Sequence, residues 1–453
     1  MAQISFVPGG RGVALLQNVG TLALLLILLP FNLTLVVVSW LLNLINSGSR
    51  TAPTKPTQRK KILLSGGKMT KSLQLARSFY AAGHEVFLVE THKYWLSGHR
   101  FSQAVKGFYT VPAPQKDPEG YCQKLLEIVK QENIDVYIPV CSPVASYYDS
   151  LAKKVLSPHC EVVHFDAEVT EVLDDKFAFC QKAHSLGLSA PKVFRITNPQ
   201  QILDFDFDAD GSRYLLKSIP YDSVRRLDMT KLPFEGMAEY VQKLPISEAK
   251  PWVMQEFIRG QEYCSHSTVR KGVIRLHCCS QSSPFQVNYE QIDNPAIYQW
   301  VKKFVRELNL TGQVSFDFIQ TEDGTVYPIE CNPRIHSAIT MFYNHPGVAE
   351  AYLEDAQDEN QRSIEPLPNS KPTYWLYHEL WRLNEVRSFS DLQKWWHTIS
   401  RGTDAIFQLN DPLPFLTVHH WQIPLLLLNN LARFKGWIRI DFNIGKLVEL
   451  GGD

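Results

Sequence analysis

Two acidic residues in the C-terminal half of the chain have the types and the spacing to bind a metal ion together. Asp317 lies in one apolar run and Glu330 in the next, and Asp323 and Gly324 stand between the two runs. An Asp-Gly pair between apolar runs favours a tight turn, which would make the two runs a β-hairpin. A two-residue turn at this pair would place Asp317 directly opposite Glu330.

The same register would pair Glu322 with Thr325, and it would place Asn332 opposite Ser315 on the face of the sheet that carries Glu330. Like charges directly opposite each other destabilise a sheet, and a divalent cation between the two carboxylates would remove this repulsion. Carboxylate and amide oxygens are hard ligands that suit Mg²⁺. The predicted metal ligands are Asp317, Glu330 and Asn332. The alternative is a solvated hairpin whose charges do not meet.

The charge balance and the cysteines exclude some classes of partner. Lysine and arginine total 46, as do aspartate and glutamate, so the formal net charge is zero. No overall field would therefore attract nucleic acid, and we expect no nucleic-acid partner. The eight cysteines include no Cys-x-x-Cys pair, which argues against a zinc site and fits a reducing compartment. A length of 453 residues predicts two to three domains.

The N-terminal part has the composition of a membrane segment. No charged residue occurs between Arg11 and Arg50, and residues 19–45 are dense in Leu, Ile and Val. This stretch is long enough to span ~30 Å of hydrocarbon. Pro30 and Asn32 interrupt it, so a kinked helix or a shallow re-entrant pair are alternatives. A cleaved signal peptide and a buried helix of a soluble protein are the other interpretations.

The charges that flank this segment predict its orientation. The downstream flank carries five basic residues, Arg50, Lys55, Arg59, Lys60 and Lys61, against Arg11 upstream. Positive charge is enriched on the cytoplasmic side of membrane segments. We therefore expect residues 1–58 to form a single membrane segment with its linker, and the rest of the chain to lie at the cytoplasmic face of the membrane.

Residues 59–165 alternate between strand and helix patterns, which predicts an α/β domain. The expected strands are 61–65, 84–90 and 134–140, and the expected helices are 72–82 and 121–131. Cys141 and Ser142 follow the last of these strands, at the end of an α/β sheet where ligands usually bind. A second unit, 166–366, contains the hairpin described above. An apolar stripe over 297–308 predicts a helix that leads into that hairpin.

The last region, 367–453, is rich in tryptophan. It holds six of the ten tryptophans of the chain, and Ile423–Leu428 opens a short apolar helix within it. This helix is too short to span a bilayer. We interpret it as a core helix of a small C-terminal cap, and a second contact with the membrane surface is the alternative.

The order of the polar residues resembles the ATP-grasp superfamily. The set comprises Lys176, Lys217, Gln255-Glu256-Phe257-Ile258, Glu262, Asp317, Glu330, Asn332 and Arg334. The resemblance covers roughly 61–367, and its most specific part is the Asp on one strand with Glu-x-Asn-x-Arg on the next. It implies an α/β (α+β) ATP-grasp fold with an N-terminal Rossmann-like pre-ATP-grasp domain.

The resemblance also implies a role for each of these residues. Lys176 and Lys217 would contact the phosphates of ATP, and Arg334 would steady a phosphorylated intermediate, so that Lys217 and Arg334 are the expected catalytic residues. Residues that would bind the nucleotide further include Gln255, Glu256 and Ile258 at the adenine and Glu262 at the ribose. The metal ligands would hold one or two Mg²⁺ ions. The segment after Lys217 lacks the glycines of a typical phosphate flap, and Ser223, Arg225 and Arg226 would supply the hydrogen-bond donors instead.

Within the superfamily the chain resembles the ligases of mycosporine-like amino acid biosynthesis, which join glycine to 4-deoxygadusol. This rests on 214–221, on 330–337, and on 411–415 with 419–421. The expected reaction forms a C–N bond and releases ADP and phosphate. A carboxylate–amine ligase that uses an acyl phosphate is one alternative, and a membrane-tethered nucleotide-binding protein without catalysis is another. His336, Ser337 and the loop at Cys141 are candidates for substrate contact by position only.

Overall fold

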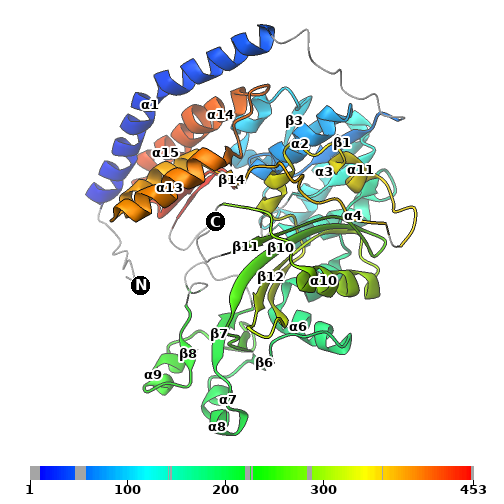
Figure 1. Ribbon diagram of the computed structural model, residues 1–453, viewed down its shortest axis with the longest axis vertical. Helices are drawn as coiled ribbons and strands as arrows, with labels where there is room; N and C mark the ends of the chain where they lie inside the picture. The colour runs from blue at the N-terminus through cyan, green and yellow to red at the C-terminus, as the bar shows by residue number, and fades with distance from the viewer. Residues whose placement is uncertain are drawn as a thin grey trace.

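The computed structural model describes residues 11–45, 58–140, 142, 145–219, 225, 228–282, 288–359 and 361–449 (Figure 1). Ser223, Arg226 and Cys141 lie outside the described residues.

A five-stranded parallel sheet follows the N-terminal segment. Its strands are β1 (Lys61–Leu64), β2 (Glu85–Thr91), β3 (Gly107–Val111), β4 (Val136–Ile138) and β5 (Glu161–Val162), in the order β3-β2-β1-β4-β5. The helices of this unit are α2 (Thr70–Ala81), α3 (Pro118–Glu132) and α4 (Ser146–Leu156). Because elements cover both faces of the sheet, Ile62, Leu63 and Leu64 of β1 are all fully buried. The α/β alternation predicted for this region is confirmed.

Two antiparallel sheets form the middle of the chain. One contains β6 (Val193–Ile196), β7 (Tyr214–Ser218), β8 (Lys231–Leu232) and β9 (Trp252–Glu256) in the order β6-β9-β7-β8. The other contains β10 (Gln261–Arg270), β11 (Val273–Gln281), β12 (Gly312–Gln320) and β13 (Val326–Asn332) in the order β11-β10-β12-β13. The strands of the first of these sheets are shorter, and we call it the smaller sheet and the other the larger sheet. In Figure 1 the smaller sheet lies below the larger one.

Helices α5 (Ala167–Asp174) and α6 (Lys176–Ser185) precede these sheets, and α10 (Pro295–Glu307) packs against the larger one. The apolar stripe predicted on α10 is buried, with Trp300 stacked on Phe304. The short elements of this part are α7 (Gln200–Leu203), α8 (Phe207–Asp210), α9 (Met237–Gln242), η4 (Ser337–Phe342) and α11 (Val348–Leu353).

The hairpin of β12 and β13 has the predicted pairing at its acidic end but not at its turn. Asp317 pairs with Glu330 and Ser315 with Asn332, as expected. Nearer the turn, however, Gln320 pairs with Val326, so the connection is a five-residue loop and the predicted Glu322–Thr325 pair is wrong. A β-bulge between Asp317 and Phe318 shifts the register. The bulge compensates for the longer loop, because a shift of one residue would otherwise turn the acidic side chains to the other face.

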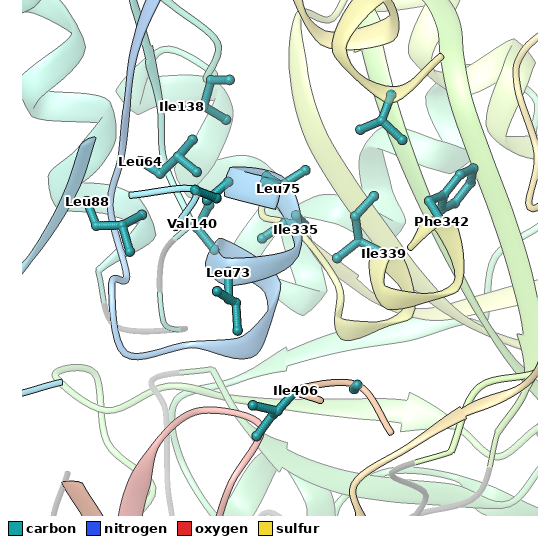
Figure 2. Close-up of a cluster of buried hydrophobic side chains, with 14 of the residues drawn as sticks. Leu64, Leu73, Leu75, Leu88, Ile138, Val140, Ile335, Ile339, Phe342 and Ile406 are labelled. Atoms are coloured by element: carbon teal, nitrogen blue, oxygen red, sulfur yellow. The ribbon is translucent and has the colours of Figure 1, made fainter. Parts of the chain in front are cut away.

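The C-terminal region contributes to the largest hydrophobic core of the described chain. Its elements are β14 (Thr373–Tyr374), α12 (Leu376–Arg382), η5 (Leu383–Glu385), α13 (Phe389–Arg401), β15 (Thr403–Asp404), α14 (Leu413–Thr417), the π-helical turn η6 (Val418–Gln422), α15 (Ile423–Ala432), β16 (Arg439–Asp441) and β17 (Lys446–Val448). Figure 2 shows Ile406 near Leu73 of α2, and Ile423 and Leu427 of α15 belong to the same core. The region therefore completes the core around the parallel sheet.

The N-terminal segment forms one helix, α1 (Arg11–Ile45), with Pro30 inside it. It is long and apolar enough to cross a membrane by length and composition. The alternative of a re-entrant pair is wrong, because the helix is continuous through Pro30 and Asn32. Asn32 does not interrupt the helix but is buried against the C-terminal region. The helix lies beside α14 and α15 (Figure 1).

Candidate functional site

The two carboxylates of the hairpin face the same environment. Asp317 on β12 and Glu330 on β13 are directly paired, and Asn332 follows on the same face. Burial, the charge of Glu330 and the charge of Glu262 together raise the pKa of Asp317 to about 8. A cation near these oxygens would offset the repulsion between the carboxylates, and the oxygen ligands fit Mg²⁺. Among the described residues, no three His, Cys, Asp or Glu side chains form a metal-binding group, so Asn332 would have to complete the set.

Lys176 stands beside this acidic pair. Its Nζ lies 3.1 Å from Oε1 of Glu330. Lys176 is the first residue of α6, and Asp175 caps that helix by accepting hydrogen bonds from two backbone N–H groups. Burial opposes the charged form of Glu330, but Lys176, Arg334 and Lys217 outweigh it and lower the pKa of Glu330. The Glu330 side chain retains 37% of its surface exposed, so a ligand can reach it.

Arg334 is held from both sides. Its Nη1 donates to Oδ1 of Asp174 at 3.2 Å, and its Nη2 donates to Oδ1 of Asn332. The latter contact competes with metal binding by the same amide oxygen. Asp174 was not among the predicted site residues, although the sequence places it two residues before Lys176. Burial raises the pKa of Asp174 and Arg334 opposes this increase.

Lys217 approaches from the smaller sheet. It lies on β7, and its Nζ donates to the backbone oxygen of Asp228 at 3.0 Å. Burial lowers the pKa of Lys217, with Lys176 contributing in the same direction and Glu330 opposing it. Lys176 and Lys217 therefore both stabilise the charged form of Glu330, although they come from different elements.

The residues predicted to bind the adenine differ in their contacts. Gln255 on β9 donates from Nε2 to the backbone oxygen of Ile329, the bulged residue beside Glu330, at 2.9 Å. The carboxylate of Glu256 accepts hydrogen bonds from Lys192 N at 3.0 Å and from Ser212 Oγ at 3.1 Å, so this side chain contacts the segments that lead into β6 and β7. Ile258 is half-buried just beyond β9.

Glu262 lies on the same face of the larger sheet as Asp317. It lies on β10, and its Oε1 accepts a hydrogen bond from Ser282 Oγ at 3.1 Å. Its charge contributes to the raised pKa of Asp317, which places it on the acidic side of the sheet. The sequence did not indicate Lys231, whose Nζ lies 3.7 Å from the centre of the Phe257 ring in a cation–π contact.

The segment after Arg334 is joined to distant parts of the chain. Lys71 of α2 donates to the backbone oxygen of Ile335 at 2.9 Å, and Asn443 donates to Ser337 Oγ at 2.6 Å. Burial, with Lys71 and Arg334, lowers the pKa of His336 to about 3, so its ring is neutral at pH 7. No local sequence pattern indicated Lys71 or Asn443, because their partners lie more than a hundred residues away.

Comparison with known proteins identifies the architecture. A family model described as the ATP-grasp domain matches residues 233–338. N5-carboxyaminoimidazole synthetase from Staphylococcus aureus is 14% identical over 75% of this chain and 88% of that chain, with a TM-score of 0.53. In its complex with ADP it is 15% identical over 70% and 82%, with a TM-score of 0.51.

Biotin carboxylase from Campylobacter jejuni, in complex with β,γ-ATP, is 14% identical over 66% of this chain and 73% of that chain, with a TM-score of 0.50. No curated protein matches the sequence. Identities this low show the fold and not the substrate. The chain thus has the ATP-grasp fold, and its residues 233–338 match the ATP-grasp domain.

Proposed function

We propose that this protein is an ATP-dependent, ADP-producing C–N ligase that phosphorylates 4-deoxygadusol and condenses it with glycine to give mycosporine-glycine. The observation that carries the ligase assignment is the convergence of an opposed carboxylate pair with three cationic side chains from separate elements. Glu330, which is paired with Asp317, lies 3.1 Å from Nζ of Lys176, and the charges of Arg334 and Lys217 also act on Glu330. The choice of 4-deoxygadusol and glycine rests on the sequence resemblance.

The nucleotide would bind between the two antiparallel sheets. Two structures of similar fold are complexes with ADP or β,γ-ATP, which supports binding of an adenine nucleotide. Asp317, Glu330 and Asn332 are the proposed ligands for one or two Mg²⁺ ions, which neutralise phosphate charge when bound. Lys176, Lys217 and Ser223 are assigned to the phosphates of the nucleotide. The nucleoside is assigned to Gln255, Glu256, Ile258 and Glu262. Binding of this kind positions the reactants and stabilises charge.

The chemistry requires activation of an oxygen that is a poor leaving group. 4-Deoxygadusol is a vinylogous acid, so its enol oxygen resembles a carboxylate oxygen. That oxygen attacks the γ-phosphorus of ATP, the bond from γ-phosphorus to the bridging oxygen breaks, and ADP leaves. The glycine nitrogen then adds to the carbon that carries the phosphate, the nitrogen loses a proton, and inorganic phosphate departs. Arg334 binds the transferred phosphoryl group with its planar guanidinium.

The proposed domain arrangement follows the same resemblance. Residues 59–165, which form the parallel sheet, would be the Rossmann-like pre-ATP-grasp domain, and 166–366 would be the ATP-grasp domain. Residues 367–453 would be the Trp-rich C-terminal extension. Residues 1–58 would attach the enzyme to the cytoplasmic face of a membrane, since α1 is apolar and the basic flank follows it.

The test is a reaction of the full chain with ATP, Mg²⁺, glycine and 4-deoxygadusol, followed by absorbance and ADP release. We expect a shift in absorbance in step with ADP release, because condensation changes the conjugated system. ADP release that depends on a substrate but occurs without any shift in absorbance would favour the acyl-phosphate ligase. Nucleotide binding without ADP release, across these substrates, would favour the non-catalytic alternative.

Replacing the lysine beside Glu330 should weaken nucleotide binding. A hydrogen bond to a charged group contributes about 1.5–3 kcal/mol, so Lys176→Met should raise the Kd for ATP by roughly ten- to a hundredfold. Isothermal titration calorimetry measures this change. Lys182→Met, in the last turn of the same helix, is the matched control and should leave the Kd unchanged. Equal affinities for the two variants would contradict the assignment of Lys176.

A further inference from the structure

The outward face of α1 is apolar along its whole length. Among the described residues, ten large apolar side chains of this helix are at least half exposed: Val13, Leu16, Leu24, Leu26, Ile27, Phe31, Trp40, Leu41, Leu44 and Ile45. Soluble monomers rarely present so large a continuous apolar surface to water. This face therefore needs a partner that the described part of the chain does not supply.

The inward face of the same helix is bound to the C-terminal region by polar side chains. Near the start of the helix, Gln17 Nε2 donates to Trp437 O at 2.8 Å and Asn18 Nδ2 donates to Lys435 O at 2.9 Å. In the middle, Asn32 Nδ2 lies 2.5 Å from Tyr377 OH and 2.6 Å from His420 Nε2. Near the end, Asn43 Nδ2 donates to Leu409 O at 2.5 Å. Leu25, between these contacts, belongs to the largest core. The contacts begin at Gln17 and end at Asn43, a distance of about 39 Å along a helix that rises ~1.5 Å per residue.

These contacts decide how the helix can meet a membrane. The hydrocarbon core is ~30 Å thick, so a helix that crosses it could not remain bound over about 39 Å to a region that carries exposed charges. We propose that α1 lies in the plane of the membrane, with its outward face in the lipid and its inward face on the protein. This inference rests on the proposed membrane attachment and replaces a crossing segment by a monotopic one.

The surroundings of α1 favour a lipid surface over another protein. Phe434 and Trp421 are also exposed, and Arg11 lies 6.0 Å from the Phe434 ring. Across the fully described stretch 376–449, six basic side chains are exposed, Arg387, Lys394, Arg401, Arg433, Lys435 and Arg439, against one exposed acidic side chain, Glu385. An apolar helix that packs on a region with an excess of exposed basic residues suits the boundary of a bilayer that contains anionic lipid.

The test measures the depth of three probes on the outward face. Leu16, Ile27 and Ile45 project within about 20° of one another around the helix at 100° per residue, and their exposed fractions are 74%, 65% and 77%. Each would be replaced by Cys in the full chain, labelled with an environment-sensitive fluorophore, and reconstituted with phosphatidylcholine and phosphatidylglycerol vesicles. Spin labels at shallow and deep positions of the lipid chains would quench the fluorophore according to its depth.

We expect equal, shallow depths for the three probes, roughly 5–10 Å below the headgroups. Lys243→Cys, at the exposed residue that follows α9, is the control and should not be quenched. A depth that changes along the helix, with Ile27 deepest, would show a crossing helix and overturn the proposal. Absence of quenching together with a stable dimer would also overturn it, because a second copy would then cover the face.

The ATP turnover of the same vesicles reports separately on the proposed function. Shallow probes in a preparation without turnover would support the in-plane helix and count against the ligase. Turnover in a preparation whose probes show a crossing helix would support the ligase and overturn the in-plane helix.

Discussion

Asp317→Asn and Glu330→Gln should each reduce ATP turnover by at least 10²- to 10³-fold, the cost commonly seen when one electrostatic contact to a developing charge is lost. Both changes keep the shape of the side chain but remove a charge from the predicted metal site. The variants should still fold. Because Asp317 is directly opposed to Glu330 and its pKa is raised, removing its charge should leave the Tm of the nucleotide-free protein equal or higher. Steady-state ADP release and thermal unfolding measure the two effects.

The hairpin itself supplies the control. Glu322 is an exposed carboxylate in the loop between the same two strands, so Glu322→Gln changes the net charge of the hairpin by the same amount. We expect ordinary turnover from this variant. Wild-type turnover by either Asp317→Asn or Glu330→Gln would remove the proposed metal site, and so would an equal loss in all three variants.

Asp411→Ala should destabilise the fold by about 3–5 kcal/mol, the cost of leaving a buried partner charge uncompensated. Asp411 binds Arg77 of α2 at 2.8 Å, and both side chains are almost fully buried. Its carboxylate also accepts hydrogen bonds from Ser102 Oγ at 2.6 Å and from Gln103 N at 3.0 Å. The change would leave three donors of the parallel-sheet unit without their acceptor. Urea unfolding of the full chain measures the loss as a lower midpoint.

An exposed ion pair gives the comparison. Glu239 on α9 and Lys243, which follows this helix, form an ion pair 2.6 Å apart with most of their surface exposed, and Glu239→Ala should change the stability by less than about 1 kcal/mol. If Asp411→Ala were as mild, the C-terminal region would not be integral to the core. Ile406, which lies in that core (Figure 2), should then also tolerate truncation.

The acidic pair illustrates how far local patterns could lead. The prediction that Asp317 lies opposite Glu330 rested on a two-residue turn at the Asp-Gly pair, and the pairing is confirmed although the turn is not. The turn was predicted incorrectly, because an Asp-Gly pair favours a two-residue connection but does not exclude a longer loop. The pairing survived because the bulge at Ile329 restores the register. Gln255 contacts the backbone of that bulged residue from another sheet, a contact that no hairpin pattern contains.

The sequence by itself determined the periodic features: the α/β alternation of the first unit, the stripe of α10, the charge-free apolar segment, and the order of the charged residues that resembles ATP-grasp proteins. These features are local, because a helix or strand repeats its burial pattern within a few residues. Only the tertiary structure decided which distant groups meet. The contacts of Arg77 with Asp411, of Lys71 with Ile335 and of Asn32 with Tyr377 join residues more than 250 positions apart. Single polar side chains of this kind leave no periodic signal, since their partners are chosen by how the sheets and helices pack.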